Sequence, residues 1–202
     1  MHAHPRPASA LFLFLFFTTA FASSLFAERV DCDNVPDDRK ARFKVAGDRL
    51  IMNGVIDTKT PLRLKKLLRR HAGIRLIVLE CVYGSVDDDA NLEAARMIRK
   101  AGIATHLASG GEIASGGTDF FLAGVKRTVG KDVLIGVHGW IDDEGLTARS
   151  LPRSHADHQS YLKYYREMGI PESFYWFTLE TPHDKVHNMT PAELRKYRIV
   201  TR

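Results

Sequence analysis

Short apolar runs alternate with amphipathic segments along most of this chain. The apolar runs have the length and composition of buried strands, and the clearest cover residues 50–52, 74–79, 103–108 and 133–137. Residues 60–72 and 91–100 carry apolar positions at helical spacing, with Pro61 where the first helix would begin. Strands and helices in this alternating order form a parallel sheet flanked by helices. We therefore predict an α/β fold with a single domain.

The C-terminal third is expected to be mainly helical. Ser154 and Asp157 are predicted to cap a helix that runs to Gly169, and Thr190 with Glu193 forms a capping box that opens a last short helix. The remaining expectations here are a loop at 139–153, an aromatic-rich helix at 171–179 and a closing strand at 199–200.

The first residues resemble a secretory signal peptide. A weakly basic start is followed by the apolar run 11–17, and small residues offer cleavage after Ala22 or Ala27. The run is shorter than the ~20 residues that a membrane-spanning helix needs. The predicted layout is a signal peptide at 1–27, a polar N-terminal arm at 28–42 and the domain at 43–202. A periplasmic or secreted protein follows, or a membrane-anchored one if the leader is retained.

The composition restricts the partners that the mature protein could have. The formal net charge of the 202 residues is +5. The densest basic cluster, Lys65, Lys66, Arg69 and Arg70, falls on one helix and is typical of a solvated face. Nucleic-acid binding would call for interleaved aromatic residues or a known motif, and no segment after the leader is apolar enough to cross a membrane.

The two cysteines, Cys32 and Cys81, leave two alternatives open. In an oxidising compartment they could pair and tie the N-terminus of the mature protein to the sheet. Cys81 also ends a strongly apolar run, which is equally typical of a buried free thiol.

The candidate chemistry lies between Gly110 and Trp140. Ser115 stands among Ala114, Gly116 and Gly117, where a turn is expected to open a buried helix. A serine at such a helix start meets the positive end of the helix dipole, which favours a developing oxyanion. His138 closes an apolar strand and could act as the general base for Ser115. The pattern predicts a serine hydrolase.

Together these segments resemble the Clp protease/crotonase superfamily, most closely its secreted, Clp-protease-like branch. The matching pieces occur in the family's order: the strand and glycine turn at 79–86, the serine turn at 113–117 with the helix 120–124, the strand pair at 127–138 and the closing helix from 189. The spacing of Ser115 and His138 is close to the family's. Two departures are Tyr83 in place of the first of two glycines, and the absence of cysteines beside the serine.

The resemblance implies a Clp/crotonase-type parallel sheet and assigns roles to this chain's residues. Ser115 would be the nucleophile, His138 the base, and the backbone N–H groups of Gly84 and Gly116 the oxyanion hole. The acid that orients the histidine should follow it, with Asp184 the first choice, Glu180 the second, and Asp142 or Asp143 a distant third. The implied substrate is a peptide or another acyl compound, with no cofactor or metal, in a protein that forms a homo-oligomer.

Several alternatives compete with this interpretation. The protein could be an inactive binding or scaffold protein of the same fold, with Tyr83 filling the pocket. The segment 137–140 resembles the oxyanion motif of α/β-hydrolases, but no Gly-x-Ser-x-Gly elbow follows it. A Ser–Lys peptidase would need Lys126, which is about three helical turns from Ser115. Zinc binding by the histidines at 155, 158, 183 and 187 with neighbouring aspartates is disfavoured, because 183 follows a proline in a loop.

Overall fold

The computed structural model of this protein describes residues 29–33, 40–142 and 144–201. The predicted signal peptide, both of its cleavage sites and most of the polar arm lie outside these residues. Within the described ranges, no helix combines the length and the hydropathy that a membrane crossing requires.

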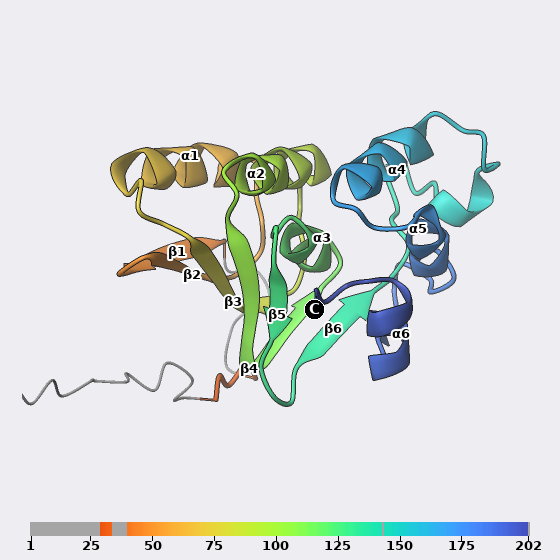
Figure 1. Cartoon of the computed structure of the whole chain (residues 1–202). Helices are drawn as coiled ribbons and strands as arrows, with labels where there is room; N and C mark the ends of the chain where they lie inside the picture. The colour runs from red at the N-terminus through yellow and green to blue at the C-terminus, as the bar shows by residue number, and fades with distance from the viewer. Residues whose placement is uncertain (1–28, 34–39, 143, 202) are drawn as a thin grey trace, which may run out of the picture.

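A seven-stranded sheet forms the centre of the molecule (Figure 1). Its strands are β1 (Arg42–Ala46), β2 (Arg49–Asn53), β3 (Leu76–Val82), β4 (Ala104–Ala114), β5 (Arg127–Val129), β6 (Leu134–Val137) and β7 (His187–Asn188). The order is β1-β2-β3-β4-β6-β7, with β5 also paired to β4. The pairs from β2 to β6 are parallel, as predicted, whereas β1 and β7 add to the two ends antiparallel, which the sequence did not predict.

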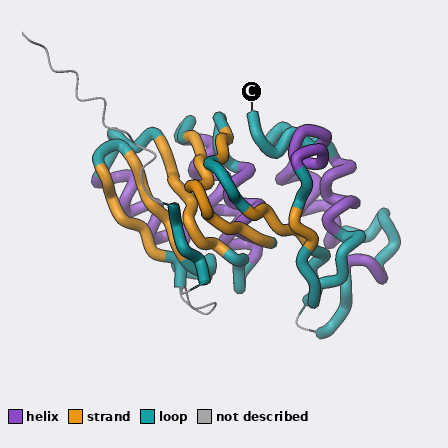
Figure 2. Tube along the Cα trace, turned by 90° about the horizontal axis from the view of Figure 1, so that it is seen from below, coloured by secondary structure: helices purple, strands orange, loops and turns teal. Residues whose placement is uncertain are grey.

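The first three helices cover one face of this sheet (Figure 1). Figure 1 shows α1 (Thr60–Arg70), α2 (Asp88–Lys100) and α3 (Gly116–Leu122) side by side above the strands, and Figure 2 shows the strands in front when the molecule is seen from below. The later helices α4 (Asp157–Glu167), α5 (Glu172–Thr178) and α6 (Pro191–Lys196) lie beyond β6, after the 3₁₀ turn at Ala148–Ser150. Pro61 begins α1 as predicted, and Thr190 and Glu193 form both hydrogen bonds of the predicted capping box.

Two predictions for the C-terminal third are wrong. Helix α4 begins at Asp157, behind Ala156 as its N-cap and without a side-chain cap, so Ser154 does not start it. Residues 199–200 form no strand, although Ile199 is fully buried and the Thr201 N–H donates to Arg127 O at 3.0 Å. This end of the chain is fixed by packing and by single hydrogen bonds rather than by a strand ladder.

Strand β4 is longer than the apolar pattern predicted. It continues through Gly110 and Gly111 to Ala114, with an irregular register against β3 between Leu79 and Cys81. Gly110 has a φ of +73°, and a Cβ atom there would lie 2.6 Å from Val30 O, so the N-terminal segment packs directly on this backbone. The expected turn of several small residues is thereby reduced to Ser115, placed at the carboxyl end of a long central strand.

Cys32 and Cys81 form a disulfide across 49 residues of sequence. Both side chains are buried, and the bond joins the N-terminal segment to β3. A cross-link over this separation restricts the unfolded chain and so stabilises the fold. Of the two alternatives left open by the sequence, the structure contains the paired cysteines.

Candidate active site

Ser115 occupies a strained turn between β4 and α3. Its backbone angles are φ 52° and ψ −127°, a region that non-glycine residues rarely adopt. The Ser115 carbonyl accepts the N–H groups of Thr118 (2.8 Å) and Asp119 (3.1 Å), which closes the first turn of α3. The hydroxyl makes no capping bond to this helix. Strain of this kind is concentrated at functional sites, and here it leaves the hydroxyl available.

Three glycines bring backbone up to Ser115. A Cβ atom at Gly117 would lie 2.0 Å from Val82 O, and one at Gly116 would lie 2.3 Å from Ser85 Oγ, so the start of α3 packs directly on the end of β3. A Cβ at Gly84 would be 3.6 Å from Ser115 Cβ and 4.0 Å from its Oγ. The backbone of Gly84 therefore lies beside the serine hydroxyl, where an oxyanion-hole donor has to be.

His138 follows β6 directly and is half-buried. Its Nδ1 lies 2.9 Å from the Gly139 carbonyl oxygen, a distance at which Nδ1–H donates to that carbonyl. In the neutral imidazole this leaves Nε2 as the unprotonated nitrogen. An imidazole held in that tautomer can accept a proton at Nε2, as a general base does.

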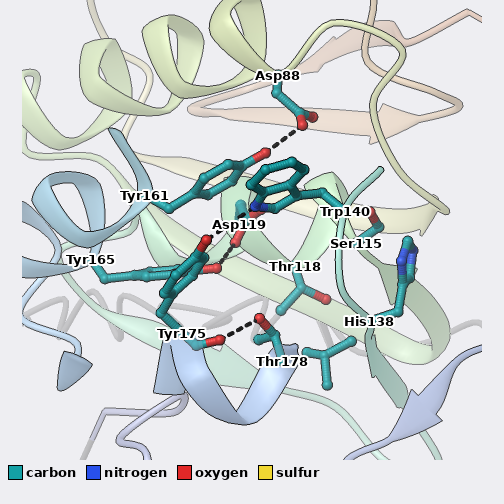
Figure 3. A pocket seen from close by; sticks show the side chains of 11 residues that line it. Asp88, Ser115, Thr118, Asp119, His138, Trp140, Tyr161, Tyr165, Tyr175 and Thr178 are labelled. Carbon is teal, nitrogen blue, oxygen red and sulfur yellow. Dashed lines mark hydrogen bonds between the residues drawn. The ribbon is translucent and has the colours of Figure 1, made fainter. Parts of the chain in front are cut away.

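Ser115 and His138 line two cavities together. The larger has a volume of about 660 Å³ and includes Tyr83 and Gly84 in its walls. The smaller, of about 40 Å³, extends toward α4 and α5 between aromatic side chains. Figure 3 shows the smaller cavity, with Ser115 and His138 at one side and Tyr161 and Tyr165 at the other. The serine and the histidine therefore belong to the walls of the same two cavities.

Of the acids predicted to orient His138, those that the structure describes do not line either cavity. Asp184 and Glu180 are exposed, and neither belongs to the walls of the two cavities, whereas Val186 lines the larger one. Asp142 accepts the N–H groups of residues 144 and 146 within its own loop, and Asp143 is outside the described residues. The structure thus brings Ser115, Gly84, Gly116 and His138 together, and the assignment of Asp184 stays a prediction.

The residues of the two minor alternatives are dispersed. Lys126 is exposed beyond the end of α3. His158 is fully buried with its Nδ1 2.6 Å from Tyr175 Oη, whereas His187 contacts Glu193 at 3.0 Å through Nε2. Over the described ranges, no three side chains of the metal-binding types come together in a group that could hold an ion.

Asp119 is a site residue that the sequence analysis missed. It lines the smaller cavity, four residues after Ser115 on α3, and its Oδ1 accepts a hydrogen bond of 2.7 Å from Tyr165 Oη. Burial raises the pKa of Asp119 to about 7, and the negative charge of Asp88 adds to the rise, against the opposing effect of the Tyr165 bond. The i, i+4 spacing from Ser115 places both residues on one helix face and was the available signal.

Because of the raised pKa, Asp119 is expected to lower the free energy of unfolding as the pH rises. Between its ordinary value of 3.8 and about 7, the folded protein holds a proton that the unfolded chain has released. The associated stability is present below pH 4 and is lost as the pH rises through 7. We expect Asp119→Asn to gain about 1–2 kcal/mol of unfolding free energy relative to wild type as the pH rises from 5 to 8, after allowance for solvent screening of a half-buried group.

Urea unfolding at both pH values measures this difference. Asp89→Asn, which changes an exposed carboxylate on α2, is the control and should follow wild type at both values. If the free energies of unfolding of wild type and Asp119→Asn change equally between the two pH values, ionisation of Asp119 does not destabilise the fold, and the prediction is wrong.

Comparison with known proteins bears on the fold. No protein-family model and no curated protein matches the chain. Among solved structures, a serine-to-alanine mutant of the 1510-N membrane-bound stomatin-specific protease is 16% identical over 75% of each chain, with a TM-score of 0.53. A lysine-to-alanine mutant of that protease in complex with a substrate peptide (17% identity, TM-score 0.48, 73% of this chain and 71% of that one) is also similar. An enoyl-CoA hydratase from Polaromonas sp. JS666 has 14% identity and a TM-score of 0.45 over 80% of this chain and 69% of its own. The chain shares the fold of the stomatin-specific protease, in agreement with the α/β fold that the resemblance to the Clp protease/crotonase superfamily implies.

Proposed function

We propose that this protein is an exported serine hydrolase that cleaves an acyl bond, with a peptide as the expected substrate. One observation carries the proposal: Ser115, in a strained turn that frees its hydroxyl, opens on the same two cavities as His138. The backbone of Gly84 beside the hydroxyl supports it. The fold shared with a membrane-bound stomatin-specific protease is compatible with this chemistry.

The proposed reaction proceeds through an acyl-enzyme. His138 Nε2 removes the proton from Ser115 Oγ as that oxygen bonds to the substrate carbonyl carbon. The N–H groups of Gly84 and Gly116 stabilise the negative oxygen of the tetrahedral intermediate. His138 then gives its proton to the leaving group, and water, deprotonated by His138, releases the acyl group and restores Ser115.

The orienting partner of His138 is proposed in two versions. In the first, Asp184 approaches Nδ1 when substrate is bound, as the family resemblance implies. In the second, the Gly139 carbonyl already present at Nδ1 is sufficient. Asp184→Asn distinguishes them, because the first version requires a loss of turnover of about a hundredfold or more and the second requires almost none.

Export is proposed from the leader-like N-terminus and is supported by the disulfide between Cys32 and Cys81. Disulfides persist mainly in oxidising compartments, which fits a periplasmic or secreted protein. Homo-oligomer formation is a further part of the proposal and rests on the family resemblance alone.

The competing proposal is a binding or scaffold protein that has lost turnover. This proposal predicts Tyr83 between the serine and the histidine. Tyr83 lines the larger cavity together with Ser115 and His138, and its hydroxyl donates to Cys32 O at 3.1 Å. Labelling of Ser115 distinguishes the two proposals. The α/β-hydrolase alternative does not apply, because the fold is a different one.

Labelling with a fluorophosphonate tests the hydrolase directly. We expect one covalent adduct per chain by intact-mass analysis, none on Ser115→Ala, and an unchanged adduct on Ser154→Ala, where an exposed serine is removed. Heat-denatured wild type should not react, because an isolated serine hydroxyl is a weak nucleophile. A folded wild-type protein that forms no adduct would favour the binding or scaffold role.

A further inference from the structure

The smaller cavity begins at the nucleophile and ends among polar aromatic groups. Its walls are Asp88, Ser115, Thr118, Asp119, Val137, His138, Trp140, Tyr161, Tyr165, Tyr175 and Thr178. No lysine or arginine belongs to this lining, whereas two carboxylates do. Aromatic rings together with carboxylates form surroundings that favour a cation. The side chain of a substrate bound at Ser115 would enter these surroundings.

The hydrogen bonds of the wall residues leave one carboxylate oxygen without a donor. Tyr161 donates to Asp88 Oδ2, and Ser85 donates to Asp88 Oδ1, so both oxygens of that carboxylate have a partner. Tyr175 Oη accepts the Trp140 indole N–H at 3.1 Å. Asp119 uses only Oδ1, toward Tyr165, and Oδ2 has no partner among the described residues. Figure 3 shows Asp119 in the middle of the lining, between the tyrosines and the Ser115–His138 side.

The dimensions favour a thin ligand. A volume of about 40 Å³ is small and holds only a few water-sized groups. The end of a lysine side chain, a narrow chain of methylene groups that carries an ammonium nitrogen, suits such a space. The planar guanidinium group of arginine is wider, and a purely apolar chain would leave the Asp119 oxygen without a hydrogen-bond donor.

The surface outside the cavity is also negatively charged. A groove of about 800 Å³ shares Asp88, Trp140 and Tyr161 with the cavity. Its other acidic wall residues are Asp87, Asp89, Asp142 and Asp157. A positively charged substrate would be attracted along this groove toward Ser115.

We propose that the smaller cavity is a specificity pocket for a linear alkylammonium chain, such as a lysine side chain next to the scissile carbonyl, with Asp119 as the recognising carboxylate. The assignment of a substrate class rests on the proposed hydrolase function, whereas binding of the ammonium group does not. The test therefore measures binding and chemistry separately.

Binding is measured with n-butylammonium as the probe and n-butanol as its uncharged counterpart. An NMR titration at pH 8 follows the indole N–H of Trp140 in the full chain. We expect saturable binding of n-butylammonium that is about tenfold or more tighter than that of n-butanol, since a hydrogen bond between charged groups is worth at least that factor. Asp119→Asn should remove the preference. Glu93→Gln, which changes an exposed carboxylate on α2 outside both the cavity and the groove, should retain it.

The preference should also weaken at pH 5.5, because the Asp119 carboxyl becomes protonated below its pKa of about 7. The other charged or titratable groups around it are Asp88 on α2, Tyr161, Tyr164 and Tyr165 on α4, Tyr175 on α5 and His138 after β6. Asp119→Asn keeps all of these other groups, so the variant measured at both pH values isolates the contribution of Asp119.

Chemistry is measured with N-acylated thioesters of lysine, arginine and norleucine. We expect lysine to be preferred over norleucine in kcat/KM by about tenfold or more in wild type, and the two to become similar in Asp119→Asn. Equal binding of butylammonium and butanol would overturn the pocket, even if a fluorophosphonate labels Ser115. Selective butylammonium binding without labelling would support the pocket and refute the hydrolase. Loss of activity toward all three thioesters in Asp119→Asn, with butylammonium binding unchanged, would overturn the recognition role and make Asp119 part of the machinery around His138 instead.

Discussion

Replacement of His138 by glutamine is expected to lower the turnover of an acyl substrate by about a thousandfold. Removal of a general base costs between about 10² and 10⁴ in rate, and glutamine cannot accept the Ser115 proton at neutral pH. The fold should persist, because the half-buried ring bonds to the carbonyl of its own neighbour, Gly139, and not to a distant element. Hydrolysis of a thioester and the rate of fluorophosphonate labelling both measure the loss.

The matched control is His71→Gln, which changes an exposed histidine at the end of α1. It should retain full turnover. If His138→Gln labels as fast as wild type, Ser115 has another base, and the proposed role of His138 is wrong. Thermal unfolding of both variants establishes that any loss of rate comes from chemistry.

The second large effect is expected on stability. Gly117→Ala should lower the free energy of unfolding by about 3 kcal/mol or more, because its Cβ would lie 2.0 Å from the backbone oxygen of Val82. The backbone of β3 cannot yield as the end of a flexible side chain would. The start of α3 must then move away from the sheet and take Ser115 with it.

Denaturant unfolding measures this cost, and Gly73→Ala is the control. A Cβ at Gly73 has no atom within 4 Å, so this variant should differ from wild type by less than about 1 kcal/mol. Equal stability of the two variants would contradict the close packing of α3 on β3. If Gly117→Ala folds but no longer labels, the displacement of Ser115 alone accounts for the result.

Local patterns determined much of the fold. The apolar runs that became β2, β3 and β6 and the helix starts at Pro61 and Thr190 depend on residues near one another in sequence, so they could be predicted. The turn at Ser115 before a buried helix was visible for the same reason, because small residues and the apolar run that follows are adjacent. The order of these segments along the chain predicted a fold of the Clp protease/crotonase type.

Other features depend on contacts between distant segments and could not be predicted. The extension of β4 to Ala114 needs the backbone of β3 and β6 beside it, since glycines have little strand preference of their own. The pairing of Cys32 with Cys81 depends on the N-terminal segment lying over β3. The antiparallel additions of β1 and β7 are likewise set by the available edges of the sheet.

For the site, the sequence by itself placed Gly84, Ser115 and His138 after apolar strands, whereas the order β3-β4-β6, which makes these strands neighbours, belongs to the folded sheet. Only the tertiary structure decided what surrounds them, because burial and polarity are properties of packed neighbours. Helices α4 and α5 bring Tyr165 and Tyr175 across the chain to Asp119, and desolvation by these neighbours turns an ordinary helix aspartate into a carboxyl group with a raised pKa. The residues next to Asp119 in the sequence do not produce this desolvation, which arises only when the cavity forms around the carboxyl group.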